Sequence, residues 1–311
     1  MKKITLMHIH FKISILFFCC NTVIFAQHED GHYPPLDPTK IYKQWDLENL
    51  TRAYCDLQPE AAFMALYNSY LKEGSTAQNI GIMETSVNAK LKVLTANSTT
   101  IYAVHPVNLN EQGGAVVVEV PAGMMGMANA PGWVNIIDIG GMGPDKGKGG
   151  KYLFTSPEYN GEIPEGYFHY KSPANTIVWL LRGFVKNGDR KATVKFMQEG
   201  IKTYSLKDAD NPPATTFYNT SNKMADGHFM DMLYDETQVF DLIKEFVKLN
   251  NGACYKRHDV IMSYLYDMGF FEGKVDKELL KKAAELGELR QRTLTFNNRV
   301  PDALKWPGKS N

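Results

Sequence analysis

Apolar side chains recur every three to four residues towards both ends of this chain, which is the spacing of an amphipathic helix. Residues 46–74 predict two consecutive helices, with Leu47, Leu50 and Tyr54 on one face of the first. Residues 226–296 predict a second helical region with the same spacing. The two helical regions flank a middle part of the chain whose pattern is different.

This middle part, residues 90–187, shows a period of two or short apolar runs, bounded by glycine, proline and asparagine, as β-strands do. A short helix over 189–201 follows it. We therefore expect an α+β fold, with a central antiparallel β-sandwich (jelly-roll-like) flanked by N-terminal and C-terminal helices. The almost continuously apolar runs 134–139 and 177–181 predict central strands. The full set of predicted strands is 90–95, 101–109, 115–120, 134–139, 151–155, 167–170 and 177–185.

The first 26 residues have the pattern of a secretory signal peptide. Lys2 and Lys3 supply the positive charge, an apolar run follows, and Ala26 is a small residue at the expected cleavage site. The apolar run is about 14 residues long, whereas a helix needs about 20 to cross a bilayer. We expect export to the periplasm or the medium, and no membrane span after signal removal. We expect the remaining chain to consist of a flexible leader (27–45), a single domain (46–300) and a tail (301–311).

Charge and cysteine content narrow the class of protein. The chain has 34 Lys and Arg against 34 Asp and Glu, and no long basic run, so we expect no nucleic-acid binding. Apolar residues make up 44% of it, enough for a substantial core. Cys55 and Cys254 remain after signal removal. They either form a disulfide between the two helical regions or remain separate buried thiols.

No recognised cofactor or nucleophile motif is present. The glycine-rich segment 140–150 lacks the first glycine and the Ser or Thr of a P-loop, so we interpret it as a mobile β-connection. Neither a Gly-x-Ser-x-Gly elbow nor a His-Glu-x-x-His helix occurs. His28 and His32 lie in the expected leader, where a preorganised metal site is not expected. We therefore expect neither a metal nor a cofactor.

Three titratable side chains of the β-region are the candidate catalytic residues, namely His105, Asp138 and His169. A histidine paired with a carboxylate can move protons in a hydrolase or a lyase. For a histidine on a strand, the alternative is a structural, hydrogen-bonded residue.

Aromatic and amide side chains of the same region suggest a binding cleft, because flat aromatic rings with amide partners suit sugars and amphipathic small molecules. The alternative is that these aromatic residues are ordinary core and rim residues of a sandwich. The predicted ligand-binding residues are Asn97, Thr100, Tyr102, Trp133, Tyr152, Asn175 and Trp179.

Five blocks carry a resemblance to a known family. They are the block from Asn97 to Tyr102, the strand from Pro131 to Asp138, the block from Lys151 to Pro157, the block from Ser172 to Gly183, and the C-terminal pattern from Met268 to Gly273. In this order they resemble the bacterial exported proteins known as domain of unknown function 1254. The chain departs from the family pattern at Thr99, where members typically have an aspartate.

The resemblance implies an exported bacterial β-sandwich with flanking helices. It implies no established activity, and family members usually continue into a second β-rich domain. The leading hypothesis is therefore a ligand-binding envelope protein with an aromatic-rich cleft, whose ligand is a small molecule or a carbohydrate. The alternatives are a hydrolase or lyase that uses a His/Asp pair, and an interaction module that needs a partner β-domain or a second copy of itself.

Overall fold

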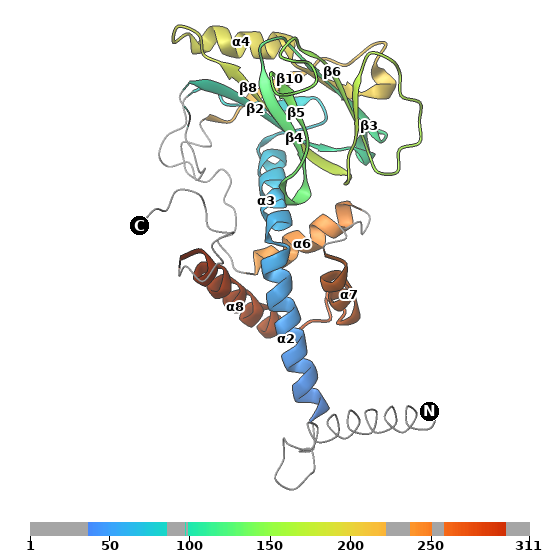
Figure 1. The fold of residues 1–311 in the computed structure, drawn as a ribbon, viewed down its shortest axis with the longest axis vertical. Coiled ribbons are helices and arrows are strands. Elements are labelled where there is room, and N and C mark those ends of the chain that lie inside the picture. Colours follow the sequence, from blue (N-terminus) through green and yellow to red (C-terminus); the bar gives the residue numbers. More distant parts are fainter. Residues whose placement is uncertain (1–36, 86–96, 98, 222–236, 251–257, 297–311) are drawn as a thin grey trace, which may run out of the picture. The chain divides into compact units, whose positions relative to one another are not determined.

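A computed structural model of the chain describes residues 37–85, 97, 99–221, 237–250 and 258–296 (Figure 1). The predicted signal peptide, the predicted strand 90–95, the tail and Cys254 lie outside these residues, so they stay predictions. The chain divides into two compact units, 1–46 and 47–311, and of the first only residues 37–46 are described. In the described part of the chain, no helix combines the length and apolarity that a bilayer crossing requires.

The described helices confirm the predicted helical regions, with one correction. The first helix begins at Pro38, so the part of the expected flexible leader from there to residue 45 is helical. The second helix has Pro59 in its first turn and ends at Gly74, whose amide donates to the Leu71 carbonyl. The α-helices are α2 (Pro38–Asp56), α3 (Gln58–Glu73), α4 (Arg190–Gly200), α6 (Gln238–Leu249), α7 (Asp259–Asp267) and α8 (Lys277–Phe296).

The first of two sheets has six strands in the order β10-β1-β2-β8-β4-β5. Its longest pairing is antiparallel, between β2 and β8, and it places His105 opposite Trp179. The prediction that 134–139 is a central strand is wrong, because β5 lies at the edge of this sheet. The strands are β1 (Asn79–Ile82), β2 (Thr100–Asn108), β4 (Met125–Ala130), β5 (Val134–Gly140), β8 (Thr176–Phe184) and β10 (Thr216–Asn219).

The second sheet has four strands in the order β7-β6-β3-β9, and neither sheet closes on itself. The antiparallel prediction holds except at β1·β10 and β6·β7, which are parallel. The expected β-core of 90–187 is too short, since β1, β9 and β10 lie outside it. The strands are β3 (Ala115–Val120), β6 (Gly150–Thr155), β7 (Phe168–Lys171) and β9 (Lys202–Ser205), and the 3-10 turns are η1 (Asn110–Gln112), η2 (Pro131–Trp133) and η3 (Leu206–Asp208).

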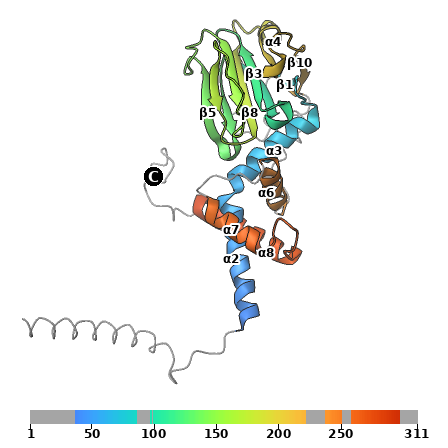
Figure 2. The same ribbon diagram turned by 90° about the vertical axis from the view of Figure 1, so that its right-hand side faces the viewer.

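Strand alternation separates the apolar side chains into distinct clusters. Ile101, Ala103 and Val107 of β2 belong to the cluster shared by the two sheets, whereas Val104 belongs to a cluster shared with the helices. In that second cluster α3 packs on β2, on η2 and on α6. Figure 2 shows α3 and α6 next to each other. Figure 1 shows α4 at the other end of the sandwich, where it contacts β2 and β8. The α+β sandwich is therefore confirmed, with helices at both of its ends.

Candidate functional site

The three candidate catalytic side chains lie on three different faces of the sandwich. His105 faces the space between the sheets, with its ring centroid 5.2 Å from that of Trp179. Asp138 lies opposite Met127, which in turn lies opposite Leu180. Leu180 packs against the helix cluster, so the side chains of this row face the helices. His169 lies on the outer face of the four-stranded sheet, beside Leu153. The expected His/Asp pair is therefore not formed, because strand alternation points its members in different directions.

His105 is also unsuited to acid–base work at neutral pH. It is fully buried, and burial lowers its pKa to about 3, which the backbone of Ala77 opposes only in part. The imidazole is therefore neutral throughout the physiological range and has no path to solvent. His105 is a core residue packed on Trp179.

His169 makes a local contact, in which its Nε2 lies 3.0 Å from Thr155 Oγ1. Partial burial and the neighbouring Lys171 lower its pKa. Groups of three or more His, Cys, Asp or Glu side chains able to hold a metal ion do not occur within the described residues. His28 and His32 lie outside those residues.

The predicted aromatic cleft is also not formed. Trp179 and Tyr152 are fully buried between the sheets, whereas Tyr102 lies on the helix-facing side of the six-stranded sheet, 5.3 Å under the guanidinium of Arg182. Trp133, in η2, packs edge-on against Phe63 of α3 at 5.6 Å. These four aromatic residues are divided between two packing regions, one between the sheets and one beside the helices. They are packing residues of a sandwich, which was the alternative interpretation.

The predicted polar ligand residues have structural roles or no described partner. Asn97 accepts hydrogen bonds from the amide and hydroxyl of Thr99, both at 2.8 Å. Thr100 begins β2 and is buried. The backbone amide of Asn175 donates to Asn250 Oδ1 at 2.8 Å, which ties the start of β8 to the end of α6.

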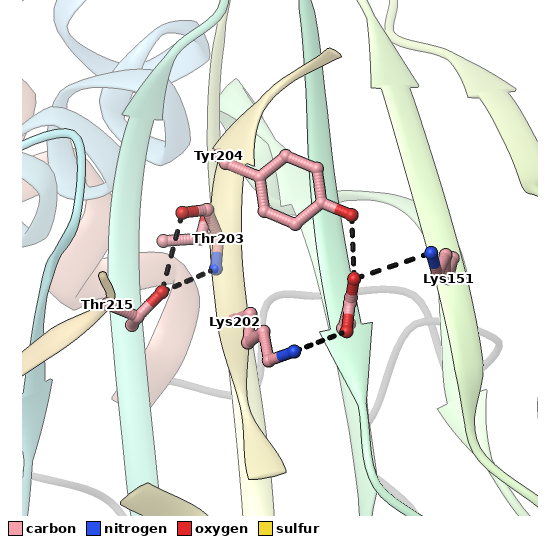
Figure 3. A network of polar contacts seen from close by, with 6 residues as sticks. Lys151, Lys202, Thr203, Tyr204 and Thr215 are labelled. Carbon is pink, nitrogen blue, oxygen red and sulfur yellow. Dashed lines mark hydrogen bonds and ion pairs between the residues drawn. The ribbon is translucent and has the colours of Figure 1, made fainter. Parts of the chain in front are cut away.

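A network of charged side chains covers one end of the outer face of the four-stranded sheet (Figure 3). Glu119 of β3 lies between Lys151 of β6 and Lys202 of β9, at 3.6 and 3.5 Å from their ammonium groups. The hydroxyl of Tyr204 donates to Glu119 at 2.7 Å. The strand register places the two lysines opposite Glu119, one on each neighbouring strand. The sequence of one strand does not show which residues of other strands lie opposite it, so this network could not be predicted from the sequence.

The negative charge of Glu119 is balanced by its neighbours, and this arrangement does not favour acid–base chemistry. Partial burial alone would raise the pKa of Glu119, but the Tyr204 hydroxyl and the two lysines outweigh burial and lower the pKa. Burial and the hydrogen bond to Glu119 raise the pKa of Tyr204, so its phenol stays protonated at neutral pH and is a weak acid. We interpret the network as a stabilising contact across three strands.

A cavity of about 280 Å³ lies beside α4, and we call it the α4 cavity. It is formed by the turn between β3 and β4, the end of β8 with the turn that follows, and the first two turns of α4. Phe184 and Phe196 are apolar walls that remain 45% and 44% exposed. The residues that line it are Ala122, Gly123, Phe184, Lys186, Asp189, Ala192, Thr193 and Phe196.

Local sequence builds the wall between β8 and α4. Asn187 and Gly188 both have positive φ, 51° and 76°, and the amide of Asp189 donates to the Lys186 carbonyl at 3.0 Å. This is the geometry of a two-residue turn that an Asn-Gly pair favours. Asp189 then begins α4, because its side chain accepts from the Ala192 amide at 2.9 Å. An Asn-Gly-Asp sequence directly after an apolar strand predicts a tight turn followed by a helix, so this part of the cavity wall could have been predicted from the sequence.

Comparisons with known proteins support the fold and the family resemblance. The model of the family described as "Protein of unknown function (DUF1254)" matches residues 78–205, which confirms the resemblance there. The crystal structure of the VPA0106 protein from Vibrio parahaemolyticus is similar with a TM-score of 0.51 at 12% identity, over 80% of this chain and 59% of that one. This chain thus spans less than two thirds of the length of that protein. The likeness shows the fold alone.

A second structure, of an uncharacterized protein from Burkholderia cenocepacia, has a TM-score of 0.28 at 13% identity, over 67% of this chain and 56% of that one. This score is too low to indicate a shared fold. The curated proteins contain no significant match to the sequence.

Proposed function

From the premise that residues 78–205 carry the DUF1254 region, we propose that this protein is an exported ligand-binding protein whose site is the α4 cavity. The site differs from the aromatic-rich cleft that the sequence predicts, although it also lies on the β-sandwich. The ligand is a small molecule with an apolar part. Export rests on the signal-peptide pattern of residues 1–26.

The observation that supports the proposal is the pair of half-exposed phenyl rings on one cavity. Single exposed apolar residues are normal on protein surfaces, whereas apolar residues gathered around a concave surface mark binding sites. Phe184 comes from the end of β8 and Phe196 from α4, so two rigid elements hold the two rings. A ligand that covers both rings gains from removing their apolar area from water, by about 25 cal/mol for each Å².

Binding fits this cavity better than catalysis. A side-chain oxygen of Asp189 accepts from the Ala192 amide, and the Thr193 hydroxyl donates to the carbonyls of Phe184 and Asp189. Among the described residues that line the cavity, there is no histidine, cysteine or second carboxylate. Acid–base chemistry needs groups that converge on one reacting atom. The hydrolase or lyase alternative depended on a His/Asp pair, and these side chains lie on different faces of the sandwich. The alternative of an interaction module stays a prediction.

A cavity-filling variant tests the proposal. We would measure the Tm of the wild-type protein and of Ala192→Leu with a panel of small aromatic and alkyl acids, alcohols, amines and monosaccharides. Ala192 is exposed on α4 and lines the cavity, and leucine is nearly as good a helix former. At a hundred times its Kd, a ligand stabilises the folded wild type by about 2.7 kcal/mol. This corresponds to a rise in Tm of about 4–5 °C for a chain of this size.

We expect at least one compound to raise the Tm of the wild type and to lose this effect in Ala192→Leu. Lys191→Leu is the matched control, since Lys191 is exposed on the same helix and does not line the cavity. If no compound raises the Tm of the wild type, or if Ala192→Leu responds as strongly, the cavity is not the binding site.

A further inference from the structure

The two charged residues at the α4 cavity are not equivalent. Asp189 and Lys186 are the two ends of the Asn-Gly turn, so they lie at the same rim of the cavity. One carboxylate oxygen of Asp189 accepts from the Ala192 amide as the N-cap of α4. This carboxylate faces the positive end of the helix, where its charge is partly compensated.

Within the described residues, the charge of Lys186 has no such compensation. Among the residues that the structure describes, no carboxylate lies within ion-pairing distance of its ammonium group. The side chain is exposed, and its backbone is held by the turn. As far as the described residues go, an unpaired cation therefore lies at the edge of a cavity whose other walls are largely apolar.

We infer that the ligand of the α4 cavity is a small monocarboxylic acid with one aromatic ring or a short alkyl chain. Its apolar part lies against Phe184 and Phe196, and its carboxylate pairs with the ammonium group of Lys186. This inference rests on the proposed function of the cavity.

The size and polarity of the cavity decide between this ligand and its alternatives. Its volume of about 280 Å³ lies just below the usual range of ligand cavities, about 300–1,000 Å³, so it suits one ring with a short chain. A primary amine of the same shape would bring a positive charge to Lys186. A neutral alcohol would fill the apolar space equally well but would form no ion pair.

An isosteric series separates charge from shape. We would measure the Kd of 3-phenylpropanoate, 3-phenylpropanol and 3-phenylpropylamine for the full chain by calorimetry at low salt. We expect the acid to bind about 3- to 10-fold more tightly than the alcohol, the range for one partly exposed ion pair or charged hydrogen bond. The amine should bind most weakly.

Variants identify the cation. Lys186→Gln should remove the preference for the acid and leave the Kd of the alcohol unchanged, whereas Lys191→Gln should change neither. Equal binding of acid and alcohol, with both lost in Ala192→Leu, would overturn the carboxylate inference and leave the proposed function standing. Tightest binding of the amine would also overturn the inference. If neither this series nor the wider panel binds the wild type, the proposed function fails as well.

Discussion

Asp145 shows how one buried side chain can organise a segment that is rich in glycine. It is 5% exposed and accepts hydrogen bonds from the amides of Gly140 and Gly149, at 2.8 and 2.9 Å. The hydroxyl of Tyr152 donates to it at 2.7 Å. A carboxylate with three donors is well compensated for its burial. The segment 140–150, interpreted from its sequence as a mobile connection, is instead an ordered turn held to the core of the sandwich.

His105 should make the protein sensitive to acid. Its pKa is about 3 in the folded protein and about 6.5 in the unfolded chain, so below pH 6.5 protons bind preferentially to the unfolded chain. The contribution of the neutral His105 side chain to the free energy of unfolding is fully present above pH 6.5. It falls by about 1.4 kcal/mol for each pH unit between 6.5 and 3. We expect His105→Phe, measured by urea unfolding from pH 7 to 4, to lack this part of the pH dependence.

The matched control is His169→Phe, because His169 is exposed and should change the slope far less. If His105→Phe does not fold, NMR titration of the wild type replaces it, and the imidazole of His105 should remain neutral at pH 5. An unchanged slope in His105→Phe, or a protonated ring at pH 5, would contradict the prediction.

At the scale of elements, one asparagine joins the helical part to the sandwich. Asn250 follows α6 and is fully buried. Its Oδ1 accepts from the amides of Asn175 and Thr176, at 2.8 and 3.0 Å, and its Nδ2 donates to the Phe246 carbonyl at 2.8 Å. The end of α6 is therefore hydrogen-bonded to the start of β8, although about 75 residues separate them in sequence.

Asn250→Ala should destabilise the protein by about 2–6 kcal/mol, because two buried backbone amides lose their acceptor and each costs about 1–3 kcal/mol when unpaired. The measurement is the free energy of unfolding in urea at pH 7. Asn160→Ala is the control, since Asn160 is exposed in the loop before β7. Equal stability of the two variants would show that the contact between α6 and β8 contributes little.

At the scale of the whole molecule, separate apolar clusters stabilise the described part of the chain. One lies between the two sheets and one between the six-stranded sheet and helices α3 and α6, while a smaller one covers the outer face of the four-stranded sheet. β2 and β8 contribute to the first two, since each presents alternate side chains to opposite faces. Loss of either strand would therefore affect both of the larger clusters.

Export is also a property of the whole molecule. If residues 1–26 are a signal peptide, the full chain made in a Gram-negative host should be recovered outside the cytoplasm with Gln27 at its N-terminus. Intact-mass measurement of the purified protein checks this. Ala26→Arg should block cleavage, because the processing enzyme requires a small residue there. A cytoplasmic protein that still carries residues 1–26 would contradict export.

Much of the fold is a local property of the sequence. The strands β2, β3, β5, β6, β7 and β8 and the helix α4 lie within a residue or two of their predicted bounds, because alternation and helical spacing are visible within a few residues. β4 was missed, since Met, Gly, Ala and Asn have little preference for strands. Pairing with β5 and β8 on both sides makes it a strand, and Gly126 lets the Leu180 carbonyl approach closely.

The amino-acid sequence alone was sufficient for the family resemblance, for the sandwich with its helices, and for six of its strands. Only the tertiary structure decided which side chains meet. Tyr102 and Trp179 lie on adjacent strands but face opposite sides of the sheet, and Phe184 and Phe196 line one cavity because α4 folds back onto the end of β8. The physical reason is that periodicity determines the direction of a side chain relative to its own strand or helix. Which strands are neighbours, and in which register, depends on pairing between segments far apart in the chain.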